Sequence, residues 1–540
     1  MRQLWQAMMM VRQCNKAAFW RKIVYVLLQS ILPIANLYVL KLLIDSIEQI
    51  VSHPYPTTSF VPYLLIMCGI YLANRIVGAL SAVNNDVLSQ MLIDYLSDKT
   101  QRQAAILDMS YYDNPQYYDT LHRAQQEVGY RPLQIINNTM GLIGATVSIV
   151  GVVALLWNTA LWIVGVMVLA VLPGFALRLY KSQIIYRFRK NNTQTYRQTS
   201  YFSALLTGRD FAKEMRAYNL SALFRERYVG VRRILRRRLT TIIRKMGAID
   251  IVCGVVESAA MLLAMVSLIG QTTKGAISIG SFVMLFEAFR RGVGYIQSWI
   301  NSFSGLYDSR LFISNLFEFL RLKPQIVSPA DALPFPKEIT CVEFHNVTFR
   351  YPDMRHNVLE HYSMRFNRGK INVIEGENGY GKSTVVKLLL RFYDPDEGAI
   401  TVNGIDIRQF NLEDLRKNIG TIFQDFVRYN STLRENVTFG ASGDDSKDIE
   451  RVIKAVGVDK IASRLEKGLD TPLGKMFDGG NELSMGQWQR VALARMLYSN
   501  AKVLVMDEPM AWLDTESRQE VNMVMDALKE EKLIIVINHR

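Results

Sequence analysis

The sequence is poor in cysteine and has no motif built from it. Its four cysteines, Cys14, Cys68, Cys253 and Cys341, are far apart and form no C-x-x-C pair. This spacing excludes a disulfide framework and a cysteine-based zinc site. Charged residues make up 21% of the chain and hydrophobic residues 49%, with 15 prolines. Disorder and collagen-like structure are therefore also excluded.

Charge is missing altogether from one long stretch. No charged residue occurs between Leu133 and Leu177, a length that suits two membrane-crossing helices joined by a turn at Trp157-Asn158-Thr159. Apolar stretches elsewhere in the first three-fifths of the chain predict four more crossings. The six predicted spans are about 23–45, 60–84, 133–156, 160–180, 250–273 and 275–303.

Basic residues set the expected orientation of these spans. The chain has 63 Lys and Arg against 49 Asp and Glu, a net charge of +14. The stretch from Lys181 to Lys245 is crowded with Arg and Lys, whereas the three short connections hold only Lys274. By the positive-inside rule the long connections are cytoplasmic. The positive charge is then a signal of topology, and no nucleic-acid partner is expected. We place the chain among the lipids of a bacterial cytoplasmic (inner) membrane.

Two domains follow from these patterns. Residues 1–322 are predicted to be an all-α transmembrane domain, whose long connections, 86–131 and 181–249, extend into the cytosol as helical hairpins. A proline-punctuated linker at 323–337 precedes an α/β domain at 338–540. In that domain, short apolar runs alternate with helical stretches, which predicts a mainly parallel sheet with helices on its faces.

The strongest motif opens the chemistry of this second domain. Residues 376–384 read G-x-x-x-x-G-K-[ST], directly after an apolar run and before a helical stretch. In such a loop, backbone N–H groups wrap around phosphate oxygens, Lys382 reaches the β- and γ-phosphates, and the Ser383 hydroxyl ligates Mg²⁺. An incidental glycine-rich turn would not need the flanking strand and helix. The residues expected to contact ATP here are Gly376, Asn378, Gly379, Gly381, Lys382, Ser383 and Thr384.

An acidic pair ends a second apolar run. Residues 502–506 are followed by Asp507 and Glu508. Adjacent acids alone usually mean a solvated turn, but after a buried strand and beside a P-loop they suit phosphoryl chemistry. We expect Asp507 to hold Mg²⁺ through water and Glu508 to polarise the attacking water.

At this point the sequence resembles the ATP-binding cassette (ABC) transporters. Leu483-Ser484-Met485-Gly486-Gln487 resembles the family signature, and it lies between the P-loop and the acidic strand, as in the family. The resemblance assigns Tyr351 to adenine stacking, Gln424 to a Q-loop with catalytic and metal-binding roles, Asp514 to the D-loop, and His539 to the catalytic switch histidine. Six spans ahead of one cassette resemble an exporter-type half-transporter.

The resemblance also implies a partner. In the family, the signature of one chain faces the nucleotide on the P-loop of another, so Ser484, Gly486 and Gln487 would complete the site of a second cassette. A homodimer is expected, with a heterodimer as the alternative. The resemblance further assigns the hairpin tips 113–117 and 211–218 to coupling helices, and the segment 477–480 to sensing them.

The chain departs from the family pattern in three places. Met485 replaces a signature glycine, and Met510-Ala511-Trp512 replaces small polar residues. Because Ser484 and Gly486 are retained, we expect an altered rate of turnover rather than its loss. The sequence stops directly after His539, which leads us to expect a truncated version of a longer product that turns ATP over poorly; a complete protein is the alternative.

Three functions compete on this sequence. The first is ATP-driven efflux of a peptide, lipid or drug-like substrate, the second an ATP-gated channel or regulator with little turnover, and the third a membrane-tethered ATPase. Glu508 argues against the second and the long hairpins against the third. Polar residues within the spans are expected to face a cavity or the bundle interior. They are Asn36, Asn74, Arg75, Asn137, Asn138, Glu257, Glu287, Arg290 and Arg291. Glu257, in mid-span, is equally balanced between lining a transport path and structural pairing.

Overall fold

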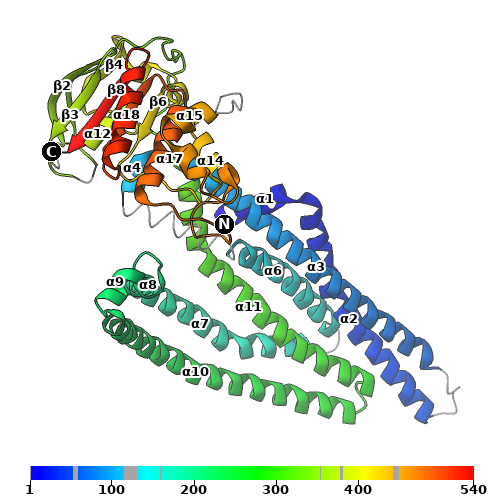
Figure 1. Ribbon diagram of the computed structural model, residues 1–540. Coiled ribbons are helices and arrows are strands. Elements are labelled where there is room, and N and C mark those ends of the chain that lie inside the picture. The colour runs from blue at the N-terminus through cyan, green and yellow to red at the C-terminus, as the bar shows by residue number, and fades with distance from the viewer. Residues whose placement is uncertain are drawn as a thin grey trace. The chain divides into compact units, whose positions relative to one another are not determined.

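The computed structural model describes residues 2–52, 59–114, 131–157, 161–352, 354–377, 381–441 and 449–539. Their contacts divide into two compact units, which are described separately below. The first comprises Met1–Ala104 and Thr120–Arg321, and the second comprises Ala105–Asp119 and Leu322–Arg540. All the strands drawn in Figure 1 belong to the second unit.

The first unit is built of helices, several of them far longer than one membrane crossing requires. The helices are α1 (Arg2–Cys14), α2 (Lys16–Ser52), α3 (Val61–Ile106), α6 (Arg131–Leu156), α7 (Leu161–Asn191), α8 (Thr193–Thr207), α9 (Ala212–Ala217), α10 (Ser221–Thr273) and α11 (Ile279–Arg321). A crossing needs about 20 residues at ~1.5 Å per residue. The surplus length of α3 and α10 lies in their charged halves, which suit water rather than lipid.

Five of the described helices are long and apolar enough to cross a membrane. They contain the stretches Lys16–Val51, Val61–Ile106, Leu133–Leu156, Trp162–Ile185 and Ser221–Thr273. Helix α11, which occupies the sixth predicted span, is not among them. Its apolar sequence is interrupted by Glu287, Arg290 and Arg291.

Packing within the first unit centres on α11, which contacts α6, α2 and α7, while α7 lies alongside α10 (Figure 1). One apolar core includes Leu88, Leu92 and Met140. A buried cation stands close to this core, since the Lys22 ammonium donates to Asn85 and, at 2.7 Å, to Asn137 Oδ1. Asn137 is itself exposed, so its contact with Lys22, rather than burial, provides the polar partner that an amide needs at membrane depth.

The second cytoplasmic hairpin breaks where the sequence predicts. Helix α8 ends at Thr207, and a Cβ on Gly208 would lie 2.6 Å from the Ala204 carbonyl oxygen, so a side chain there would collide with the turn. Helix α9 then forms within the predicted coupling segment 211–218. Of the first coupling segment, 113–117, Asp113 and Asn114 lie among the described residues, at the end of the short helix α4 (Met109–Asp113).

The second unit contains two sheets. A parallel sheet has the strand order β3-β8-β7-β6, formed by Ile371–Gly376, Leu533–His539, Val503–Asp507 and Ile419–Ile422. An antiparallel sheet has the order β2-β1-β4-β5, formed by Leu359–Asn367, Cys341–Phe349, Glu397–Val402 and Ile405–Asp406. The sequence predicts only a mainly parallel sheet, and in this it is incomplete. Irregular pairing between Phe344 and Val347 breaks the apolar alternation that would have marked β1 as a strand.

Helices cover the parallel sheet, which separates two cores. They are α12 (Lys382–Leu389), α13 (Leu412–Lys417), α14 (Leu433–Thr438), α15 (Ile449–Ala455), α16 (Val458–Ala462), α17 (Met485–Tyr498) and α18 (Thr515–Leu528), with 3₁₀ turns at Ile407–Gln409 and Gly468–Asp470. In β7, Val505 enters one core, whereas Leu504 and Met506 enter the other. Burial on both faces explains why this strand is a continuous apolar run.

Candidate active site

The predicted catalytic residues lie at the carboxyl ends of neighbouring parallel strands. Gly376, the last residue of β3, pairs in register with His539 of β8, and Asp507 of β7 pairs with Ile537 of β8. Parallel strands deliver their carboxyl ends to one edge, which is where open α/β sheets bind ligands. The sheet topology thus brings together segments that are more than a hundred residues apart in sequence.

Lys382 is the first residue of α12 and is nearly buried, at 6% exposure. Its ammonium donates to the Gly376 carbonyl at 2.6 Å and to the Asn538 carbonyl at 3.3 Å. The cation is therefore held across the mouth of the loop, beside the positive end of the α12 dipole. This is the charge distribution that a phosphate group requires.

Gly381 is needed for the loop to close. Its φ is +77°, and an added Cβ would lie 2.8 Å from Leu359 Cδ2 and 3.0 Å from the Val358 carbonyl oxygen. Both the backbone conformation and the space exclude a larger residue.

The proposed metal ligands contact each other directly. The Ser383 hydroxyl donates to Asp507 Oδ2 at 2.9 Å, and Asp507 is 3% exposed. A hydroxyl and a carboxylate oxygen are ligands that Mg²⁺ accepts when substrate phosphates and waters complete its shell. No group of three or more His, Cys, Asp or Glu side chains suited to a metal occurs in the described ranges.

Glu508 sits on strained backbone next to the Q-loop residue. Its φ is +49°, a left-handed conformation that costs a non-glycine residue about 1–3 kcal/mol. The Glu508 N–H donates to the Ile537 carbonyl at 3.0 Å, and Gln489 Nε2 donates to the Glu508 carbonyl at 2.9 Å, which together fix this geometry. Gln424 Nε2 donates to Glu508 Oε2 at 3.2 Å. Two residues that the sequence assigns to catalysis are thus in contact.

Tyr351 belongs to an aromatic cluster. Its ring meets Phe349 and Tyr393 edge to face, at centroid distances of 5.0 and 5.3 Å. Its hydroxyl lies 3.1 Å from Thr384 Oγ1 on the P-loop helix. The Lys387 ammonium stands 5.1 Å from the Tyr351 ring centroid. The ring that is predicted to stack on adenine is therefore oriented by the P-loop helix.

Tyr393 connects this cluster to the first cytoplasmic hairpin. Its hydroxyl donates to Asp113, although the two residues are 280 apart in sequence. Burial raises the pKa of Tyr393, and the hydrogen bond to Asp113 raises it further, so the hydroxyl remains a donor at physiological pH. Asp108 reinforces the connection by accepting from the Gln325 N–H at 2.5 Å. Sequence reasoning missed Tyr393, because nothing in a single sequence reveals a contact between residues so far apart.

The signature segment forms the start of a helix. Ser484 caps α17, its hydroxyl accepting from the Gln487 N–H at 3.3 Å while Gln487 Oε1 accepts from the Ser484 N–H at 2.9 Å. The Ser-x-x-Gln spacing is the sequence pattern that signals this capping box. A Cβ on Gly486 would lie 2.6 Å from the Trp512 carbonyl oxygen, so a glycine is required for this approach.

The D-loop residue Asp514 also acts as a helix cap here. It accepts from the Ser517 N–H at 2.8 Å at the start of α18, and the hydrogen bonds from Ser517 lower the pKa of Asp514. Trp512, two residues earlier, is 58% exposed, and its backbone N–H donates to Gln489 Oε1 at 3.0 Å. The signature and D-loop segments therefore pack on each other.

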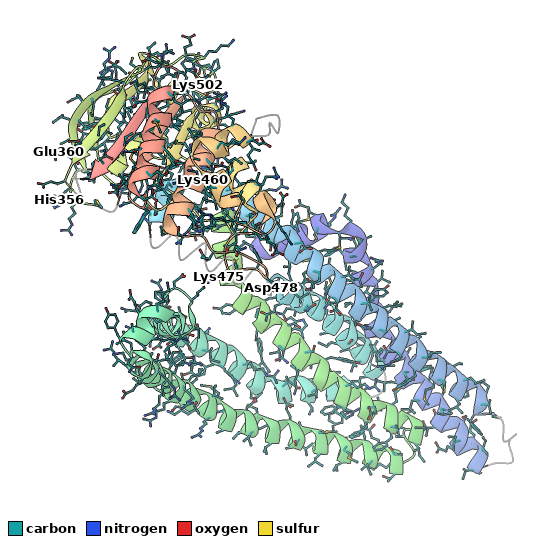
Figure 2. All side chains as sticks on the ribbon, viewed as in Figure 1. His356, Glu360, Lys460, Lys475, Asp478 and Lys502 are labelled. Atoms are coloured by element: carbon teal, nitrogen blue, oxygen red, sulfur yellow. The ribbon has the colours of Figure 1, made fainter. Side chains whose placement is uncertain are left out.

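Some of the predicted residues lie outside what the structure describes. They are Asn378 and Gly379 in the P-loop, and the side chain of His539, whose backbone ends β8. The predicted sensing segment is described, and Figure 2 places its Asp478, with Lys475, at the end of the second unit opposite Lys502. Phe477 in this segment is 64% exposed.

Comparison with known proteins places this geometry in a family. A family model described as ABC transporter matches residues 359–511. The subtilin transport ATP-binding protein SpaT of Bacillus subtilis is 28% identical over the whole chain and 88% of its own length. The nisin transport ATP-binding protein NisT of Lactococcus lactis subsp. lactis is 27% identical over 94% of this chain and 84% of its own length. A solved bacterial Atm1-family ABC exporter with ATP bound has the same fold, with a TM-score of 0.80 and 21% identity, covering 97% of this chain and 92% of that one.

These similarities extend over both units, which confirms the expected order of a helical membrane domain followed by an α/β cassette. The protein is an ATPase whose hydrolysis is coupled to transport. It is a multi-pass membrane protein with its cassette in the cytoplasm. The chain is a half-transporter of the ABC transporter family, of the exporter type.

Proposed function

We propose that two copies of this chain export a peptide from the cytoplasm, with ATP bound between their two cassettes. The main evidence for a dimer is that the P-loop half-site and the signature half-site occupy different parts of one cassette. Lys382 and Ser383 lie at the carboxyl end of the parallel sheet, whereas Ser484 and Gly486 begin α17, where a Cβ on Gly486 would lie 2.6 Å from the Trp512 carbonyl oxygen beside the D-loop. We therefore assign the signature half-site to the nucleotide of a second cassette.

The peptide class rests on the extent of the similarities. The two relatives that align over nearly the whole chain are named for the transport of subtilin and nisin, which are peptides. The ATP-dependent lipid A-core flippase of Vibrio vulnificus aligns over 80% of this chain at 28% identity. Membrane helices carry substrate choice in such proteins, so similarity that includes all of them favours the peptide.

Binding of ATP would rearrange a site whose polar groups already contact one another. The Lys382 ammonium would leave the Gly376 and Asn538 carbonyls for the phosphates. Ser383 and Asp507 would hold Mg²⁺, which when bound neutralises charge on the phosphates. Glu508 would orient the attacking water, with Gln424 beside it and His539 at the end of β8. The Gln424–Glu508 contact favours hydrolysis over an ATP-gated channel, which has no use for a general base.

In the proposed dimer, the start of α17 of one chain completes the nucleotide site of the other. Ser484 caps that helix by accepting from the Gln487 N–H, and the positive end of the helix dipole lies at this turn. A helix N-terminus of this kind attracts a γ-phosphate presented by a second copy. Gln487 and Asp514 would border the same surface.

We also propose that α11 is the sixth crossing. It has 43 residues, about 65 Å at the usual helical rise, and it packs against α6, α2, α7, α10 and α1 of the first unit. Its charged residues would then face protein or water instead of lipid. Six crossings return the chain to the cytoplasmic side, where the cassette lies.

Proteoliposomes containing the purified protein would test the proposal. Glu508→Gln should abolish ATP turnover, retain ATP binding and trap a dimer, whereas Lys382→Ala should weaken ATP binding itself. Inside-out vesicles should accumulate nisin only when ATP is present and Glu508 is intact. Unchanged ATPase activity in Glu508→Gln would refute the catalytic assignment, and a monomer in the trapped state would refute the shared site.

A further inference from the structure

Helix α11 carries a polar stripe through its apolar sequence. The polar and small residues recur every three or four positions and therefore share one face. They are Glu287, Arg290, Arg291, Gly294, Gln297, Ser298 and Asn301. A Cβ on Gly294 would have no atom within 4 Å, and Ser298 and Asn301 are exposed. Polar groups this open at membrane depth need water or a ligand beside them.

The charges at the outer end of the stripe pair locally. Glu287 lies 2.8 Å from Arg290 and 3.5 Å from Arg291, one helical turn away on the same helix. One carboxylate thus serves two guanidiniums, and Arg291 also donates to the Pro33 carbonyl at 3.4 Å. Each of these three residues has a protein partner, so none needs a ligand to account for it.

Two charges beside the inner end of the stripe are arranged differently. Glu257 of α10 accepts from Gln297 Nε2 at 2.8 Å. Arg178 of α7 donates from Nη1 to Asn301 Oδ1 at 2.9 Å and lies 3.4 Å from the Gln297 carbonyl oxygen. Within the described ranges, neither charge forms an ion pair. The carboxylate and the guanidinium thus both contact Gln297 and are held apart by it.

The direction of Glu257 excludes a lipid-facing role. A Cβ on Gly174 of α7 would lie 3.8 Å from Glu257 Oε1, and Gln297 of α11 donates to the same carboxylate. Glu257 therefore lies between α7 and α11. The face of α10 open to the surroundings is apolar, with Val255 and Leu262 each more than 60% exposed. Glu257 is only partly buried, which leaves its carboxylate accessible from the α11 stripe.

The layer lies near the cytoplasmic mouth of the membrane domain. Arg178 and Asn301 are close to the inner ends of their predicted spans, and Glu257 is seven residues, about 10 Å, from the start of its span. A substrate coming from the cytoplasm would meet this layer first. Among the described residues neither Glu257 nor Arg178 has an ion-pair partner, and charges of this kind are costly in a low-dielectric layer unless a ligand compensates them.

We propose that Glu257 and Arg178, spaced by Gln297, form an entry subsite for a peptide segment that carries both signs of charge. The Glu257 carboxylate takes an ammonium or guanidinium of the segment, and Arg178 takes a carboxylate. The α11 stripe, with Asn301, supplies neutral hydrogen-bonding groups between them. This inference rests on the proposed export of a peptide and names the chemistry of the segment that is recognised.

Binding of short dye-labelled peptides to the full-length protein in nanodiscs tests the subsite. The probes are peptides of equal length that alternate Lys and Glu, or consist of Lys, Glu or Ser alone, followed by fluorescence anisotropy without ATP. The wild type should bind the alternating peptide best. Glu257→Gln should weaken the Lys-containing peptides roughly tenfold or more, with little effect on the all-Glu peptide, and Arg178→Gln should do the reverse.

Matched controls use the same changes on the same helices. Asp250→Asn on α10 and Arg187→Gln on α7 alter exposed charges outside the layer and should leave peptide binding unchanged. Thermal unfolding and ATP binding show whether each variant is folded. Equal weakening of all peptides in both variants, or no weakening in either, would overturn the subsite.

The binding assay also separates this inference from the proposed function. Charge-selective binding without ATP-driven uptake of any peptide would support the subsite and refute peptide export. Uptake of nisin that is indifferent to Glu257 and Arg178 would support export and refute the subsite.

Discussion

The contact between Tyr393 and Asp113 gives the sharpest test of how the nucleotide site communicates with the first hairpin. The Tyr393 ring packs edge to face on Tyr351, the expected adenine-stacking residue, while its hydroxyl donates to Asp113. Tyr393→Phe removes the hydroxyl and keeps the ring. Nucleotide affinity should therefore stay the same, and only the link to the hairpin should weaken.

The size of the effect follows from the two partners. A hydrogen bond to a charged group contributes about 1.5–3 kcal/mol, and because Asp113 is exposed we expect the lower end. About 1.5 kcal/mol corresponds to a roughly tenfold change in an equilibrium constant. Hydrogen exchange of residues 105–114 should therefore accelerate roughly tenfold in Tyr393→Phe, and the stimulation of ATPase activity by peptide should fall.

The same substitution elsewhere in the cassette provides the control. Tyr362 is largely buried, and its hydroxyl contacts Met364 rather than the hairpin, so Tyr362→Phe should leave exchange of 105–114 unchanged. A double-mutant cycle with Asp113→Asn should return about 1.5 kcal/mol of coupling. Equal acceleration in both tyrosine variants, or no coupling in the cycle, would refute the reasoning.

Three further predictions concern the signature, the D-loop and the topology. Gly486→Ala should lower the free energy of unfolding by about 1–3 kcal/mol and slow ATP turnover, because its Cβ would lie 2.6 Å from the Trp512 carbonyl oxygen. Calorimetry measures the loss, with Gly230→Ala, whose Cβ would meet no atom within 4 Å, as the control. Equal melting temperatures for the Gly486→Ala variant and the wild type would contradict this prediction. Trp512, 58% exposed, should become buried when ATP closes the cassettes, so the Glu508→Gln protein should show a blue-shifted emission that Trp512→Phe lacks. A cysteine at Lys274, between α10 and α11, should react with a membrane-impermeant thiol reagent in whole cells; labelling only after permeabilisation would invert the topology.

The motifs that can be predicted from the sequence are those encoded in a few consecutive residues. The P-loop requires glycine, lysine and serine at fixed spacing, and the structure places Lys382 and Ser383 beside the acidic strand. Hydrophobicity likewise sufficed for five helices, since burial in lipid demands it all round the helix. Helix α11 escapes this rule because one of its faces is polar, so the apolar pattern alone could not establish it.

What the sequence could not reveal depends on residues brought together from far apart. The Tyr393–Asp113 contact and the layer around Gln297 join different elements, and no local pattern encodes them. The antiparallel sheet was missed for a different reason, because its central strand is irregular. The role of Glu257, which the sequence leaves open between a transport path and structural pairing, becomes specific only in the structure, where its carboxylate accepts from the Gln297 amide.

The polar contacts of the nucleotide site also suggest how binding becomes motion. Lys382, Ser383 and Glu508 each have a protein partner, so ATP exchanges contacts rather than filling empty ones. Gln424 is the partner that matters most, because it follows β6 and leads towards α14, which packs on α17. On the proposed mechanism, a water that takes its place beside Glu508 would displace Gln424, and that displacement would reach α14 and the signature helix. Replacement of Gln424 by water at the Glu508 carboxylate would then convert ATP binding at the P-loop into a displacement of α17, whose first turn is proposed to face the second cassette.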